Sequence, residues 1–184
     1  MTKPHGTVRI IGGSLRGSRI EVPPISGLRP TPDRVRETLF NWLAPMIEGA
    51  RCLDLFAGSG ALGIEALSRG AAQVTFVESD GVALASLRAT LARLHAVAAD
   101  VVARDAMAFL AGPAAPYDVV FIDPPFDAAL WQPAIDALAS GWLKPGAIVH
   151  VESPLGQALK VPAAWKLHRQ GHAGAVAQSL YRID

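Results

Sequence analysis

The sequence has few of the features that mark secreted, disulfide-bonded or membrane-spanning proteins. A single cysteine, Cys52, excludes a disulfide framework and any multi-cysteine zinc site. No apolar run approaches the roughly 18 residues that a membrane-spanning helix needs. The start of the chain, MTKPHGTVRIIGG, lacks the apolar segment of about 7–15 residues that a signal peptide contains. We therefore expect a cytoplasmic protein without a membrane anchor.

The five histidines show no spacing that is typical of a metal site, so we expect no metal. The chain of 184 residues is 51% hydrophobic, which is enough for one well-cored domain. We find no internal repeat and no linker long enough to separate a second globular domain.

Basic residues gather near the N-terminus, although the net charge of the whole chain is only +1. Residues 1–36 have a balance of +5, and the rest of the chain has a balance of −4. A basic segment joined to a mildly acidic body indicates a polyanionic partner, or simply a solvated segment. Charge alone leaves both interpretations open.

The first 30 residues are predicted to be extended and rich in turns. The patterns VRIIGG and SRIEVP predict a small hairpin. A helix is expected next, with Thr31 as its N-cap, Pro32 at its first position and Pro45 at its end. We therefore divide the chain into a basic arm or hairpin at residues 1–30, which is not an independent domain, and a domain at residues 31–184.

From residue 51 onward, apolar strand patterns alternate with helical patterns. This order predicts an α/β fold with a mostly parallel sheet and helices on both faces. The segments WKLHRQ and AQSLYRI predict an antiparallel pair that closes the sheet. The expected strands are 52–56, 74–78, 101–103, 119–122 and 147–151, and the expected helices are 61–69, 80–94, 106–110 and 131–140.

A glycine-rich loop follows the first of these strands. Gly58, Gly60 and Gly63 match the pattern G-x-G-x-x-G, which lets the backbone approach a ligand at the start of a helix. Glu78 ends the next strand, where an acid commonly accepts the hydroxyls of a ribose. The spacing predicts a nucleoside cofactor, and the alternative is a tight turn followed by a surface glutamate.

The loop itself does not choose between a dinucleotide and S-adenosylmethionine. Asp54 favours S-adenosylmethionine, because a carboxylate attracts its ammonium and sulfonium groups and repels a pyrophosphate. Asp105 follows the third strand, where an adenine amino group can donate to it. Both aspartates can instead cap a helix or a loop.

The stretch VVFIDPPFD predicts the catalytic residues Asp123, Pro124, Pro125 and Phe126. Asp123 ends a strand at the sheet edge where ligands bind in such folds. Its carboxylate and the Pro124 carbonyl can accept the two N–H groups of an exocyclic amine. The two prolines hold that carbonyl in place, which is the condition for strong electrostatic stabilisation. Phe126 offers a flat face to a planar base, and the alternative is a plain Pro-Pro turn.

Asp123 to Phe126 resemble the [D/N/S]-P-P-[Y/F/W] motif of methyltransferases that act on planar amino groups. Segments along nearly the whole chain resemble the RsmD family of bacterial 16S ribosomal RNA guanine-N2 methyltransferases. These segments are GLRPTPDRVRETLFNWLAP, CLDLFAGSGALGIEALSRGA, FIDPPF, GWLKPGAIVHVES and LHRQGHAGAVAQSLYR.

The resemblance implies a class I, Rossmann-like methyltransferase fold with a seven-stranded sheet and the cofactor S-adenosylmethionine. It also implies a guanine of 16S rRNA as substrate, at a guanine-966-type site in an assembled or late-precursor 30S subunit, and we expect a monomer. Asp123, Pro124, Pro125 and Phe126 would hold the guanine. The implied cofactor-binding residues are Asp54, Phe56, Ala57, Gly58, Ser59, Gly60, Glu78, Asp105 and Ala106.

In this light the basic arm is expected to anchor RNA. Ser14 and Ser18 stand where the family often has more basic side chains. One arginine of the first helix can instead pair with Glu37 or Asp33. The predicted RNA-binding residues are Arg9, Arg16, Arg19, Arg29, Arg34 and Arg36.

Other functions share parts of this pattern. An adenine-N6 methyltransferase of DNA or RNA uses the same tetrapeptide, but a DNA enzyme normally needs a larger target-recognition region. A protein-glutamine methyltransferase more often has Asn at position 123. A nicotinamide-dependent oxidoreductase would need a catalytic pair such as Tyr-x-x-x-Lys, which does not follow the glycine loop. A catalytically silent RNA-binding assembly factor would have no reason to combine Asp123 with Phe126.

Overall fold

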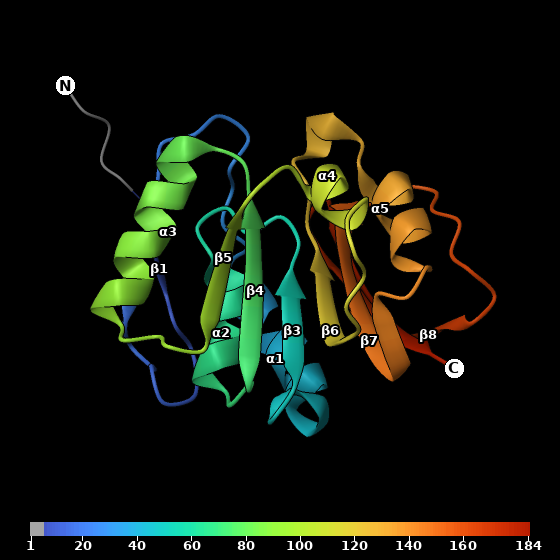
Figure 1. Ribbon diagram of the computed structural model, residues 1–184, viewed down its shortest axis with the longest axis horizontal. Helices are drawn as coiled ribbons and strands as arrows, with labels where there is room; N and C mark the ends of the chain where they lie inside the picture. Colours follow the sequence, from blue (N-terminus) through green and yellow to red (C-terminus); the bar gives the residue numbers. More distant parts are fainter. Residues whose placement is uncertain (1–5) are drawn as a thin grey trace.

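A computed structural model of the protein describes residues 6–184, so Lys3 of the predicted basic arm lies outside the described residues. Within this range a seven-stranded sheet has helices on both faces, and a separate two-stranded hairpin lies next to α3 (Figure 1). Among residues 6–184, none of the helices combines the length and the apolar content that a membrane span requires.

The sheet has the strand order β5-β4-β3-β6-β7-β9-β8. Neighbours from β5 to β7 are parallel, and β9 runs antiparallel to both β7 and β8. The prediction of a mostly parallel sheet with an antiparallel closing strand is therefore confirmed. The strands are β3 (Arg51–Asp54), β4 (Gln73–Glu78), β5 (Ala99–Ala103), β6 (Tyr117–Ile122), β7 (Leu143–Pro154), β8 (Trp165–Ala173) and β9 (Val176–Ile183).

Two hydrophobic clusters cover the two faces of the sheet. Successive residues of a strand point to opposite faces, so Cys52 and Val119 belong to one cluster and Leu53 and Val120 to the other. The first cluster packs under α1 (Asp33–Ile47), α2 (Ala61–Ser68) and α3 (Gly81–Arg93), and the second under α4 (Ala106–Leu110) and α5 (Trp131–Leu138).

The ends of α1 differ from the prediction. The helix begins at Asp33 with Pro32 as its N-cap, and the hydroxyl of Thr31 donates to Glu152 instead of capping the helix. Pro45 was expected to end the helix, but it lies inside it. A proline removes one backbone donor, and burial of Leu43 and Ile47 against the core offsets the loss of that hydrogen bond.

The predicted hairpin is confirmed as β1 (Gly6–Arg9) and β2 (Arg19–Val22), with Val8 opposite Ile20. Both of these side chains are buried in the same cluster as α1, α2 and α3. The hairpin is therefore anchored to the body by apolar packing, while Arg9 and Arg19 are exposed and Arg9 lies 3.7 Å from Asp33. A short 3-10 helix, η1 (Phe126–Ala128), follows β6.

Candidate active site

A cavity of about 780 Å³ lies at the carboxyl ends of the parallel strands. It is bounded by the ends of β3, β4 and β6, by the glycine loop and by the segment 25–32 that precedes α1. The predicted site residues that line it are Arg29, Asp54, Phe56, Ala57, Gly58, Ser59, Glu78, Asp105, Ala106, Asp123, Pro124, Pro125 and Phe126.

Glu78 holds the glycine loop against the end of β4. Its Oε2 accepts a hydrogen bond from the backbone N–H of Gly58 at 2.8 Å, and its Oε1 accepts from those of Ser79 and Asp80 at 2.9 and 2.8 Å. Three backbone donors thus orient a carboxylate that also lines the cavity. Glu78 is thus a fixed acceptor at the cavity, as the predicted contact with ribose hydroxyls requires.

The other two glycines of the loop serve close packing. Gly60 has φ of +82°, and a Cβ there would lie 2.4 Å from Cδ1 of Leu87. A Cβ on Gly63 would lie 2.3 Å from Cε1 of Phe76. Gly60 was predicted to bind the cofactor, but it is not among the residues that line the cavity. The two glycines let α2 start close to the sheet.

Asp54 is a buried carboxyl group at the end of β3, only 2% exposed. Its Oδ2 accepts from the backbone N–H of Gly63 at 3.0 Å. Burial raises the pKa of Asp54 to about 7, the Gly63 hydrogen bond opposes this rise, and the charge of Glu78 adds to it. A cation bound beside Asp54 would favour the ionised carboxylate.

Asp105 has two roles in the structure. Its Oδ1 accepts from the backbone N–H groups of Met107 and Ala108, both at 3.0 Å, so it caps α4. It also lines the cavity. The capping interpretation is therefore correct, and it leaves the other carboxylate oxygen of Asp105 for a ligand.

The tetrapeptide after β6 offers hydrogen-bond acceptors that the fold itself does not use. Among the described residues, neither the Asp123 carboxyl nor the Pro124 carbonyl accepts a hydrogen bond. Burial and then the charges of Glu152 and Asp54 raise the pKa of Asp123 well above its usual range. Phe126 is 43% exposed, and its ring is edge-to-face with Trp131 at 5.6 Å between ring centres.

Two residues of the site, Glu152 and Thr31, were missed by the sequence analysis. Glu152 lies near the end of β7, lines the cavity and accepts a hydrogen bond from the Thr31 hydroxyl at 3.0 Å. An acid at the end of an apolar strand was the signal that indicated Asp54, Glu78 and Asp123. The same signal was present in AIVHVES.

The segment 25–32 forms the N-terminal wall of the cavity. Leu28 packs on the glycine loop so closely that a Cβ on Gly58 would lie 2.6 Å from its Cδ1. Arg29 is exposed and lines the same wall. The wall joins the hairpin to α1, so it connects the basic arm with the cavity.

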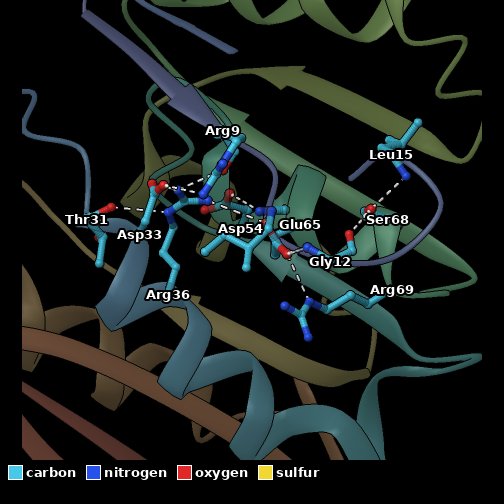
Figure 2. Close-up of polar contacts among 12 residues, drawn as sticks. Arg9, Gly12, Leu15, Thr31, Asp33, Arg36, Asp54, Glu65, Ser68 and Arg69 are labelled. Carbon is cyan, nitrogen blue, oxygen red and sulfur yellow. Dashed lines mark hydrogen bonds and ion pairs between the residues drawn. The ribbon is translucent and has the colours of Figure 1, made fainter. Parts of the chain in front are cut away.

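Arg36 cannot bind RNA, contrary to the prediction, because its side chain is fully buried. Its guanidinium donates to the carbonyl oxygens of Thr31 at 3.1 Å and Arg9 at 2.9 Å, and pairs with Asp33 and Glu65 (Figure 2). The alternative prediction, that one arginine of the first helix pairs with Asp33, is thus correct for Arg36. Arg9, Arg16, Arg19 and Arg34 are exposed outside the cavity lining.

The carboxylate acceptors of the cavity fit S-adenosylmethionine. Asp54 can balance a cation and Glu78 can accept from ribose hydroxyls. Asp105 can accept from an adenine amino group. Three carboxylates around one site would repel a pyrophosphate. The structure therefore favours the cationic cofactor over a dinucleotide.

Comparisons with known proteins agree with this fit. The family described as conserved hypothetical protein 95 matches residues 8–182. The chain is 52% identical to the ribosomal RNA small subunit methyltransferase D of Escherichia coli K12, over all of this chain and 96% of the relative. It is 45% identical to the protein of the same name from Haemophilus influenzae, over 96% of this chain and 94% of the relative.

Solved structures show the same fold. The structure of yhhF from Escherichia coli superimposes with a TM-score of 0.89 at 50% identity, over 97% of this chain and 99% of that one. A Thermus thermophilus 16S rRNA N2 G1207 methyltransferase, solved with AdoMet and guanosine, has a TM-score of 0.73 at 23% identity. That alignment covers 98% of this chain and 50% of the other. The second likeness supports the class I methyltransferase fold alone.

Proposed function

Because the chain belongs to the family of ribosomal RNA small subunit methyltransferase D, we propose that it methylates 16S rRNA. The reaction transfers a methyl group from S-adenosylmethionine to the exocyclic N2 of one guanine. The proposed target is a guanine-966-type site in an assembled or late-precursor 30S subunit.

One observation carries the proposal: the Asp123 carboxyl and the Pro124 carbonyl accept no hydrogen bond from the described residues and line the cavity of the glycine loop. Two free acceptors side by side match the two N–H groups of an exocyclic amine. Phe126 lies beside them and offers a partly exposed ring on which a base can stack. The site can therefore hold an amino-bearing base next to a bound cofactor.

Positioning accounts for most of the catalysis in this proposal. The cofactor supplies an electrophilic methyl group when it is bound. Asp123 and Pro124 accept the N2 hydrogens and turn the nitrogen lone pair out of conjugation with the ring. The nitrogen loses one proton as its new bond to carbon forms, and the raised pKa of Asp123 suits that carboxylate to accept the proton. Well-oriented reactants alone can lower a barrier by about 7–11 kcal/mol.

The basic arm supplies the contacts to the RNA backbone in this proposal. Arg9, Arg16 and Arg19 are exposed on the hairpin, and Arg34 is exposed on α1. Arg29 is exposed and lines the cavity, where it can contact a phosphate or the cofactor carboxylate. We further propose a cytoplasmic monomer that acts without a metal.

The test uses purified protein, labelled S-adenosylmethionine and 30S subunits from cells that lack this activity. Mass spectrometry of the 16S rRNA should find one new N2-methylguanosine. The variant Asp123→Ala should lose methyl transfer but retain cofactor binding and RNA binding. Unmodified rRNA after incubation with the wild-type protein, or methylation at an adenine, would refute the proposal.

A further inference from the structure

Glu152 lies on the side of the cavity that faces away from the cofactor site. In the parallel pair β6 and β7, Ile122 is the register partner of Val151, so Asp123 and Glu152 follow as the next residues of the two strands. Asp54, which fits the cofactor, belongs to β3 on the opposite side of β6. Glu152 therefore borders the space that remains for the acceptor base.

The structure holds Glu152 in place but leaves one of its oxygens available. Its Oε2 accepts from the Thr31 hydroxyl at 3.0 Å, and its backbone carbonyl accepts from Nε1 of Trp131 at 2.7 Å. Glu152 is only 7% exposed, and it lines the cavity. No donor in the described part of the chain reaches its Oε1. This oxygen is an oriented acceptor that a ligand in the cavity can use.

The position of Glu152 beside Asp123 is unfavourable without a ligand. Burial raises the pKa of Glu152, although the Thr31 hydrogen bond opposes this rise. The charge of Glu152 in turn raises the pKa of Asp123. Two neighbouring buried carboxyl groups destabilise each other when both are ionised. A ligand edge with several adjacent N–H donors would relieve this cost, whereas an edge with a lone pair would increase it.

We propose that Glu152 accepts the N1–H of the target guanine and thereby selects guanine over adenine. Guanine presents N1–H next to its N2 amino group, so its edge offers donors to both Asp123 and Glu152. Adenine presents an N1 lone pair next to its N6 amino group, which would face the Glu152 carboxylate. A site built for a hydrogen bond rejects a base that lacks it, because its buried polar groups stay unpaired. This inference rests on the proposed guanine methylation and names the residue that specifies the base.

The test uses two kinds of reconstituted 30S particles. One carries guanosine at the target position, and the other carries 2-aminopurine riboside at that position. 2-Aminopurine keeps the N2 amino group but has a lone pair at N1. The wild-type protein should prefer guanine by at least about tenfold in kcat/KM, the discrimination typical of a lost base contact. In Glu152→Gln the side-chain amide can donate to the N1 lone pair. The ratio of kcat/KM for guanine to kcat/KM for 2-aminopurine should then fall to about one or below, while kcat/KM for guanine drops by at least about tenfold.

Controls separate recognition from folding and from the proposed function. Glu152→Gln should bind S-adenosylmethionine as tightly as wild type, and Glu48→Gln, an exposed change at the C-terminus of α1, should leave the base preference unchanged. If the variant slows both bases equally, Glu152 is only structural and the inference is overturned. If Glu152→Gln does not bind cofactor, Glu152→Asp is measured in its place. A preference for guanine in Glu152→Asp that equals the wild-type preference then overturns the inference. A wild-type protein that does not methylate the guanine particles refutes the proposed function itself.

Discussion

Nη1 of Arg36 lies 3.4 Å from Oε2 of Glu65, and both side chains are fully buried. Glu65 also accepts from the backbone N–H groups of Ile11 and Gly12, both at 2.9 Å, and pairs with Arg69 at 2.9 Å (Figure 2). One charged pair therefore connects the N-terminal arm, α1 and α2. Since α2 begins at the glycine loop, the position of the arm depends on the same helix as the cofactor site.

Replacement of Arg36 should destabilise the whole fold. Arg36→Met removes a buried cation and leaves Glu65 without one of its charged partners, which we expect to cost about 3–5 kcal/mol of unfolding free energy. Arg34→Met, on the exposed side of the same helix, should change it by less than about 0.5 kcal/mol. Urea denaturation of both variants measures the difference. Equal stabilities would contradict the connecting role of Arg36.

The exposed arginines of the hairpin should determine how RNA binding depends on salt. Replacing Arg9, Arg16 and Arg19 with alanine should weaken binding to 16S rRNA. It should also reduce the slope of log K against log salt by about 0.7–0.9 for each lost phosphate contact. A triple alanine variant of Lys160, Arg169 and Arg182, which lie outside the arm, is the control. Filter binding at several salt concentrations provides the slopes, and an unchanged slope would exclude the arm as the RNA contact.

Cofactor affinity should depend on pH through Asp54. Burial raises the pKa of Asp54 to about 7, so a proton competes with the cationic cofactor below that pH. The dissociation constant should rise by up to about tenfold per pH unit between pH 7 and pH 5. Asp54→Asn should bind weakly with little pH dependence in this range. Calorimetry of both proteins checks this, and identical pH profiles would show that Asp54 does not face the cofactor cation.

Acid should destabilise the fold through His150. This side chain is fully buried, burial lowers its pKa to about 4, and its Nε2 lies 3.2 Å from Oε1 of Gln178. The unfolded chain takes up the proton near pH 6.5, whereas the folded chain does so only near pH 4. Stability from the neutral ring is therefore complete above pH 6.5 and falls as the pH drops toward 4.

His150→Leu isolates this contribution from the carboxyl groups of the cavity, whose raised pKa values act in the opposite direction. The stability of wild type relative to His150→Leu should decrease by about 2 kcal/mol between pH 7.5 and pH 5. Denaturant unfolding at the two pH values measures the change. A constant difference would mean that His150 is not held neutral in the fold.

Most of the fold could be predicted from local sequence patterns. Alternating strands and helices, the hairpin and the closing antiparallel pair are all present, because each depends on hydrophobic periods that neighbouring residues carry. The exception at Pro45 has a tertiary cause, since burial of Leu43 and Ile47 keeps the helix intact beyond the proline.

Most residues of the site could also be predicted from the sequence, but not all of them. Asp54, Glu78, Asp105 and Asp123 each end a strand or follow one closely, and the parallel topology brings their side chains to one edge. Glu152 carries the same signal and was overlooked. The segment 25–32 has no signal that predicts a cavity wall, because its place depends on where the hairpin and α1 dock.

Consecutive residues alone specify the order of the strands and helices, the glycine loop and the acceptor pair after β6, since each depends on a local sequence pattern. Long-range packing buries Arg36 while Arg34 stays exposed, and it lets the Thr31 hydroxyl donate to Glu152 instead of capping α1. These outcomes depend on contacts between residues far apart in the chain, such as Arg36 with Glu65 and Thr31 with Glu152. Charge and hydrogen-bonding capacity are properties of a residue, whereas the partner that uses them is a property of the fold.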